Sequence, residues 1–126
     1  MKKEFIPYNE ALELKELGYN DYEKLALYCK GVLYQLYPNM HEDIPDNVYR
    51  EVDAPLYQQA FRWFREKWGY TSWIEQVGNE FNYKVYGRGV YHKPIHTSSY
   101  SSYCKSYEEA ELKLLKELII IVKEIE

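Results

Sequence analysis

Apolar residues recur at helical spacing in three segments of the chain, residues 8–17, 55–68 and 107–125. In the second and third segments they gather on one side of a helical wheel, with mainly charged or amide side chains on the other, and in the first segment Ala11, Leu12, Leu14 and Leu17 supply the apolar side chains. Gly18 and Gly69 follow the first two segments, and glycine is the residue type that most often ends a helix. The pattern therefore predicts three amphipathic helices.

The last of these helices has the clearest start and the widest apolar side. Ser106 and Glu109 form a capping box, in which each side chain accepts a hydrogen bond from the backbone N–H of the other residue. Ile120 falls in the middle of the polar side of this helix. A single exposed Ile is common on protein surfaces, and the alternative is a subunit contact. A homodimer through this helix is therefore one hypothesis.

Strand signals come in pairs. Residues 25–36 carry Tyr, Val and Leu around a Lys-Gly turn, which predicts a β-hairpin, and a helix running through that glycine is the competing interpretation. Residues 73–77 and 81–86 predict a second pair of strands around a Gly-Asn turn. Residues 88–91 are a candidate for one further strand.

Residues 38–53 and 94–102 have loop composition, because Pro, Asn, Asp and Ser recur in them. The element order is then α-β-β-α-β-β-α. We expect a single α+β domain over residues 1–126, with an antiparallel sheet of about four strands and helices packed on it. The predicted core consists of Leu12, Leu14, Leu17, Leu27, Leu33, Ala60, Phe61, Phe64, Trp68, Val85, Leu115, Leu118 and Val122.

Cysteine content and hydropathy indicate the compartment. The chain has two cysteines, too few for a disulfide framework, and they do not have metal-binding spacing. The N-terminus lacks the apolar stretch of a signal peptide, and the longest apolar run, residues 118–122, is far shorter than the roughly 20 residues that span a membrane. We therefore expect a cytoplasmic protein with reduced thiols and no membrane partner.

Two segments, residues 54–67 (APLYQQAFRWFREK) and 106–112 (SYEEAEL), resemble small proteins encoded by phages and integrated mobile elements of gut bacteria. The opening Phe5-Ile6-Pro7-Tyr8, with the helix that follows it, is similar too. No function is known for such proteins. The resemblance implies a setting, in which a host or phage protein would be the partner, and it carries over no catalytic residue.

Two groups of polar residues have the side chains that catalysis or metal binding requires. His92 and His96 have the spacing that places two ligands on one helix face, but Pro94 between them removes the helical geometry. Cys104 is a candidate third ligand or a nucleophile. Residues 41–46 hold one His and three acids in a segment of loop composition, where such groups are usually solvated. We predict a non-enzymatic protein with no metal and no cofactor.

Charge is distributed unevenly along the chain. Residues 81–107 contain no acidic residue, although the whole chain has a net charge of −4. Residues 61–107 carry a net charge of +4 between ends of −5 and −3. Tyrosines and serines are interleaved with the bases, a composition suited to stacking on nucleic-acid bases or to protein contacts. The alternative is an ordinary sheet and a polar loop from which acids are absent by chance.

Strand alternation selects the members of a candidate binding surface. It places Tyr83 and Val85 on one face and Lys84 and Tyr86 on the other, and Val85 is the better core residue. The predicted surface joins these outward residues to other basic and aromatic side chains: Lys84, Tyr86, Arg88, Tyr100, Tyr103, Arg62 and Arg65. It favours a protein-binding accessory module, and the alternative is a weak single-stranded nucleic-acid-binding protein.

Overall fold

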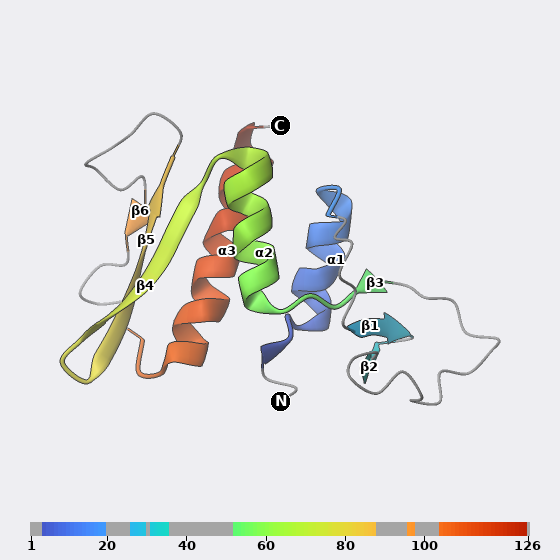
Figure 1. The fold of residues 1–126 in the computed structure, drawn as a ribbon, viewed down its shortest axis with the longest axis horizontal. Coiled ribbons are helices and arrows are strands. Elements are labelled where there is room, and N and C mark those ends of the chain that lie inside the picture. The colour runs from blue at the N-terminus through green and yellow to red at the C-terminus, as the bar shows by residue number, and fades with distance from the viewer. Residues whose placement is uncertain are drawn as a thin grey trace. The chain divides into compact units, whose positions relative to one another are not determined.

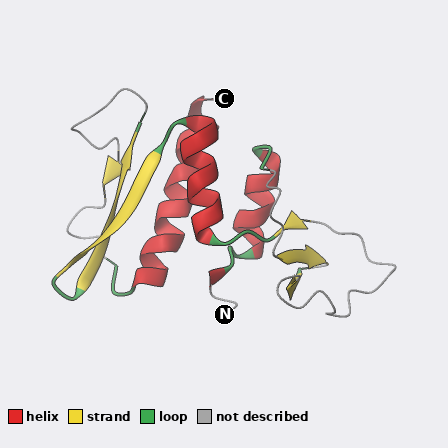
Figure 2. Ribbon diagram, in the orientation of Figure 1, coloured by secondary structure: helices red, strands yellow, loops and turns green. Residues whose placement is uncertain are grey.

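The structure is a computed structural model that describes residues 4–19, 26–29, 31–35, 52–87, 96–97 and 104–125. Helices and antiparallel sheets combine into an α+β fold, as the sequence predicts (Figure 1; Figure 2). The elements follow the order α1, β1, β2, β3, α2, η2, β4, β5, β6 and α3. The chain divides into two compact units, residues 1–59 and 60–126. A single domain over residues 1–126 would require these two units to fold together, and it stays a prediction.

In the first unit, α1 spans Tyr8–Glu16 and ends where Gly18 adopts a positive φ of 90°. The N–H of Tyr19 donates to the carbonyl of Leu14 at 2.9 Å, and the N–H of Gly18 donates to that of Lys15 at 3.0 Å. These two bonds form a Schellman motif, which satisfies carbonyls left without partners at a helix end. The glycine therefore ends this helix as predicted.

The first sheet contains β1 (Ala26–Cys29), β2 (Val32–Gln35) and β3 (Val52–Asp53) in the antiparallel order β2-β1-β3. β1 pairs with β2 from Cys29 opposite Val32, and Gly31, directly before β2, has a φ of 77°. Glycine tolerates this left-handed conformation without a steric cost. The predicted hairpin is thus confirmed, and the competing helix through the glycine is wrong.

The N-terminal segment is tied to this unit by two backbone groups of Ile6, whose side chain is fully buried. Its N–H donates to the carbonyl of Pro55 at 2.9 Å, and its carbonyl accepts from the Tyr28 hydroxyl at 2.7 Å. Leu14 and Leu27 are buried as well. The segment before α1 therefore contributes to the core of the unit.

α2 (Tyr57–Trp63) begins in the first unit and continues into the second as a π-helical segment, η2 (Phe64–Trp68). It ends at Gly69, which has a φ of 80°. The N–H of Tyr70 donates across this end to the carbonyl of Phe64 at 3.1 Å. The predicted helix over residues 55–68 is therefore present, but its last part has wider turns than an α-helix.

The second sheet contains β4 (Thr71–Val77), β5 (Glu80–Tyr86) and β6 (His96–Thr97) in the antiparallel order β4-β5-β6. β4 and β5 form the second predicted hairpin, and Gly78 in its turn has a φ of 65°. α3 (Tyr107–Ile125) packs on β5 and β4 (Figure 1). Its buried side chains are Ala110, Leu114, Leu115, Leu118, Ile119, Ile121 and Val122.

The start of α3 follows the predicted capping box in part. The Ser106 hydroxyl accepts a hydrogen bond from the N–H of Glu109 at 3.1 Å. The Glu109 carboxylate accepts from the N–H of Lys105 at 3.2 Å, one residue earlier than a capping box requires.

Among the described residues, none of the helices has both the length and the apolar character needed to cross a membrane.

The predicted sheet is not confirmed as a single sheet of about four strands. The strands that the structure describes form two separate sheets of three. β3 and β6 lie within residues 38–53 and 94–102, so the loop prediction is wrong at these two places. Each of the two strands has only two residues, too few to show the alternation that identifies a strand.

Four predicted core residues are only half-buried: Leu12, Leu33, Phe61 and Trp68. Leu12 lies about 160° from Leu14 on the helical wheel, so the two cannot share one face. Leu33 lies in β2, an edge strand of its sheet, where a side chain has neighbours on one side only. Trp68 is the last residue of η2, directly before Gly69, so no further helical turn covers its ring.

Candidate binding surface on the second sheet

The pairing of β4 with β5 sorts their side chains onto two faces. Val85 is fully buried and Tyr83 is 8% exposed, and both lie on the face that α3 covers. The other face is named the outer face here, and its members alternate with these residues. It consists of Thr71, Trp73, Glu75 and Val77 from β4 and Glu80, Asn82, Lys84 and Tyr86 from β5.

Two aromatic rings stack on the outer face. The ring centroids of Trp73 and Tyr86 lie 4.6 Å apart, and their planes differ by 15°. Trp73 is 41% exposed and Tyr86 is half-buried. Trp73 stands opposite Lys84 in the register, so Tyr86 is its diagonal neighbour, within reach of a large ring. The pair presents a fixed aromatic surface to solvent.

An ion pair between Lys84 and Glu75 lies beside the stack of Trp73 and Tyr86. The Lys84 Nζ is 3.0 Å from the Glu75 Oε1. With its amide nitrogen turned toward Glu75, Asn82 donates to the carbonyl oxygen of that residue at 3.3 Å and to its Oε1 at 3.2 Å. The hydrogen bond from Lys84 is the largest cause that lowers the pKa of Glu75 below its ordinary value, and hydrogen bonds from Asn82 and Trp73 act in the same direction. Glu75 is therefore ionised at neutral pH, and the Lys84 ammonium has a partner.

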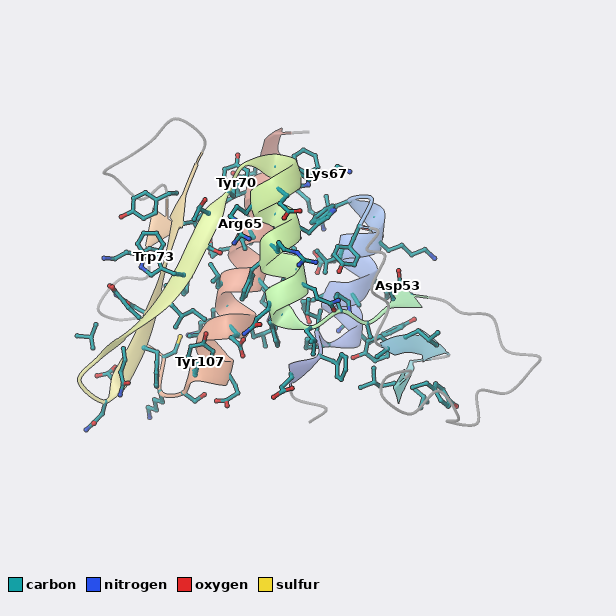
Figure 3. The ribbon with its side chains drawn as sticks, in the orientation of Figure 1. Asp53, Arg65, Lys67, Tyr70, Trp73 and Tyr107 are labelled. Carbon is teal, nitrogen blue, oxygen red and sulfur yellow. The ribbon has the colours of Figure 1, made fainter. Side chains whose placement is uncertain are left out.

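The structure places only some of the predicted surface residues on the outer face. Lys84 and Tyr86 share the outer face, as the alternation predicts. Arg62 and Arg65 are exposed on α2 and η2. Figure 3 shows Arg65 on the helical side of the second sheet and Trp73 on its opposite side, so Arg65 does not extend the outer face. The remaining three residues, Arg88, Tyr100 and Tyr103, lie outside the described residues.

Trp73 is the functional candidate that the sequence interpretation missed. A signal for it was present, because a two-residue turn fixes the register of a hairpin. With Val77 paired to Glu80, counting back along both strands places Trp73 opposite Lys84. The register of the hairpin, rather than the composition of residues 81–107, identifies this neighbour.

A pocket of about 230 Å³ lies in the second unit, where residues of β4 meet residues of α2 and α3. It is lined by Phe61, Ser72, Trp73, Ile74, Tyr107 and Leu114. The Ser72 hydroxyl oxygen is buried and has no hydrogen-bond partner among the residues that the structure describes. An unpaired buried hydroxyl destabilises a fold, so this position is imperfectly packed.

Cys104 is fully buried, and its backbone exchanges two 2.8 Å hydrogen bonds with Phe81. Burial raises the pKa of its thiol, which makes the thiol a poor nucleophile. His92 lies outside the described residues, and of His96 the structure describes only the backbone, which pairs with Val85. Across the part of the chain that is described, no three His, Cys, Asp or Glu side chains are grouped to hold a metal ion.

Comparison with known proteins adds no assignment. No protein-family model matches this chain, and neither a curated protein nor a solved structure is significantly similar to it. The chemistry of the outer face is therefore the basis for a functional proposal.

Proposed function

We propose that this chain is a non-enzymatic protein-binding module and that the outer face of its second sheet is the binding surface. The observation that carries the proposal is the stack of Trp73 on Tyr86, next to the Lys84–Glu75 ion pair. Trp and Tyr are enriched among the residues that dominate the energy of protein interfaces. Rings already held by stacking lose little side-chain entropy when a partner covers them.

The charge of the outer face favours a protein over single-stranded nucleic acid. A nucleic-acid site needs cations that can neutralise phosphates. Lys84 is paired with Glu75, and Glu80 adds a further acid to the same face. Arg65 lies on the helical side of the sheet (Figure 3). The alternative of a weak single-stranded nucleic-acid-binding protein therefore has less support from the described residues.

The resemblance to proteins of phages and mobile elements suggests the kind of partner. In that setting, an accessory protein that binds a host or phage protein would account for a surface built for contact. Arg88, Tyr100 and Tyr103 extend the proposed surface in the sequence, and their part in it stays a prediction.

The proposal is tested by comparing two aromatic substitutions. Wild type, Trp73→Ala and Tyr107→Ala are immobilised and exposed to lysate of the bacterial host, with and without nuclease treatment. Tyr107 is a matched control, because it is exposed to a similar extent but lies on α3 rather than on the outer face. We expect a protein that wild type and Tyr107→Ala retain and that Trp73→Ala binds about tenfold more weakly once purified.

Two results would contradict the proposal. Equal retention by Trp73→Ala and wild type would remove the outer face as the binding surface. Retention that disappears after nuclease treatment, or that falls steeply between about 50 and 200 mM salt, would support the nucleic-acid alternative.

A further inference from the structure

The exposed side of α3 has a charge pattern that is complementary to itself. Ile120 is 47% exposed, although its neighbours Ile119 and Ile121 are buried. One helical turn before it stands Lys116, and one turn after it stands Glu124, and both are exposed. An apolar side chain thus lies midway between two opposite charges on one face of the helix.

This pattern distinguishes between two ways of pairing α3 with a copy of itself. If two α3 helices cross antiparallel at Ile120, each Lys116 faces the Glu124 of the other chain, and both contacts are attractive. If the helices run parallel in register, Lys116 faces Lys116 and Glu124 faces Glu124, and both contacts are repulsive. Glu117 and Lys123 also lie at equal distances from Ile120. An antiparallel pair therefore places Glu117 of one chain opposite Lys123 of the other, which is again an attractive contact.

We propose that the exposed side of α3 binds a second copy of this chain, in an antiparallel pair with Ile120 at the two-fold axis. The charge complementarity of Lys116 and Glu124 about that axis is the reason for choosing a second copy as the occupant. A single helix pair buries little surface, so the dimer is weak and reversible. This contact is separate from the outer face of the second sheet.

Charge reversal followed by charge exchange tests the pairing. Association is measured by sedimentation equilibrium up to about 100 μM, a range suited to weak dimers. Lys116→Glu places two acids opposite each other and is expected to weaken the dimer at least fivefold. The double variant Lys116→Glu/Glu124→Lys restores opposite charges across the axis and is expected to return the affinity to within about twofold of wild type. Ile120→Lys is expected to give a monomer.

Lys105→Glu is the control, because it reverses an exposed charge outside this side of α3 and leaves the dimer unchanged. All of these positions are at the surface, so the variants are expected to fold. A wild-type chain that is monomeric at about 100 μM would overturn the proposal. A double variant as weak as Lys116→Glu alone would overturn the antiparallel arrangement, and so would a dimer that Ile120→Lys leaves intact.

Discussion

Among single residues, the hydroxyl of Ser72 is an unsatisfied group whose removal is expected to help the fold. Ser72 pairs with the fully buried Val85 on the face of the sheet that α3 covers. Its oxygen is buried, finds no hydrogen-bond partner within the described part of the chain, and borders the pocket of about 230 Å³. A buried polar group without a hydrogen bond costs about 1–3 kcal/mol.

Ser72→Val is therefore expected to raise the free energy of unfolding by about 1 kcal/mol, because it removes the hydroxyl, adds apolar volume beside a pocket and favours a strand. Thr71→Val is the control, because Thr71 precedes Ser72 in β4 and is exposed on the outer face. It should change the stability by less than about 0.5 kcal/mol. Urea denaturation of the two variants and of wild type measures both changes in the free energy of unfolding. A loss of stability in Ser72→Val would show that the hydroxyl has a partner after all.

Residue environments were predictable where they depend on alternation alone. The faces of Tyr83, Val85, Lys84 and Tyr86 follow from the period of a strand, and the structure confirms them. The burial of Trp68 was not predictable in this way, because Trp68 is the last residue of η2 and the contacts at a helix end do not follow from helical spacing. A side-chain pattern thus identifies the face of an element, but it does not show how far neighbouring elements cover that face.

Among the elements, the two hairpins were the most predictable, because a glycine at a positive φ sets each turn. Gly78 has a φ of 65°, and a Cβ added there would meet no atom of the described residues within 4 Å, apart from those of its two neighbours in the chain. Any cost of a substitution at this position therefore comes from the local backbone conformation, and contacts with residues farther along the chain contribute nothing.

Gly78→Ala is expected to lower the free energy of unfolding by about 1 kcal/mol, because alanine in the left-handed conformation brings its Cβ close to the next carbonyl. Gly78→Asn should cost less, since asparagine adopts this conformation more readily. Thermal melts of the two variants give the comparison. If alanine were tolerated as well as asparagine, the turn would not have the backbone conformation described here.

The sequence predicts neither the two short strands, β3 and β6, nor the division of the strands between two sheets, and both failures have the same reason. β3 pairs with β1 through only two residues, and these lie far from β1 in sequence. β6 pairs with β5 in the same limited way. Periodicity shows that a segment is suited to a strand, but it contains no information about the strand with which it pairs. The sequence therefore predicts one sheet for the two hairpins, and the structure describes them in two.

For the whole molecule, the element order suggests two similar halves, but the sheets argue against a duplication. In the first sheet, the first strand in sequence is central, and in the second sheet the second strand is central. The halves thus share a sequence of elements without sharing a topology. What connects the two units along the chain is α2, because the boundary between residues 59 and 60 falls inside this helix.

Because a continuous helix crosses that boundary, we expect the two units to unfold together, in keeping with the predicted single domain. The three tryptophans, Trp63, Trp68 and Trp73, all belong to the second unit, so their fluorescence reports its unfolding alone. Leu14→Ala removes a buried side chain from the first unit and should cost about 2–5 kcal/mol. Under cooperative unfolding, it lowers the fluorescence midpoint and the far-UV circular dichroism midpoint in urea equally. Leu118→Ala, in the second unit, is the control and should do the same. A fluorescence midpoint that Leu14→Ala leaves unchanged would mean that the units unfold independently, and the prediction of a single domain would then be wrong.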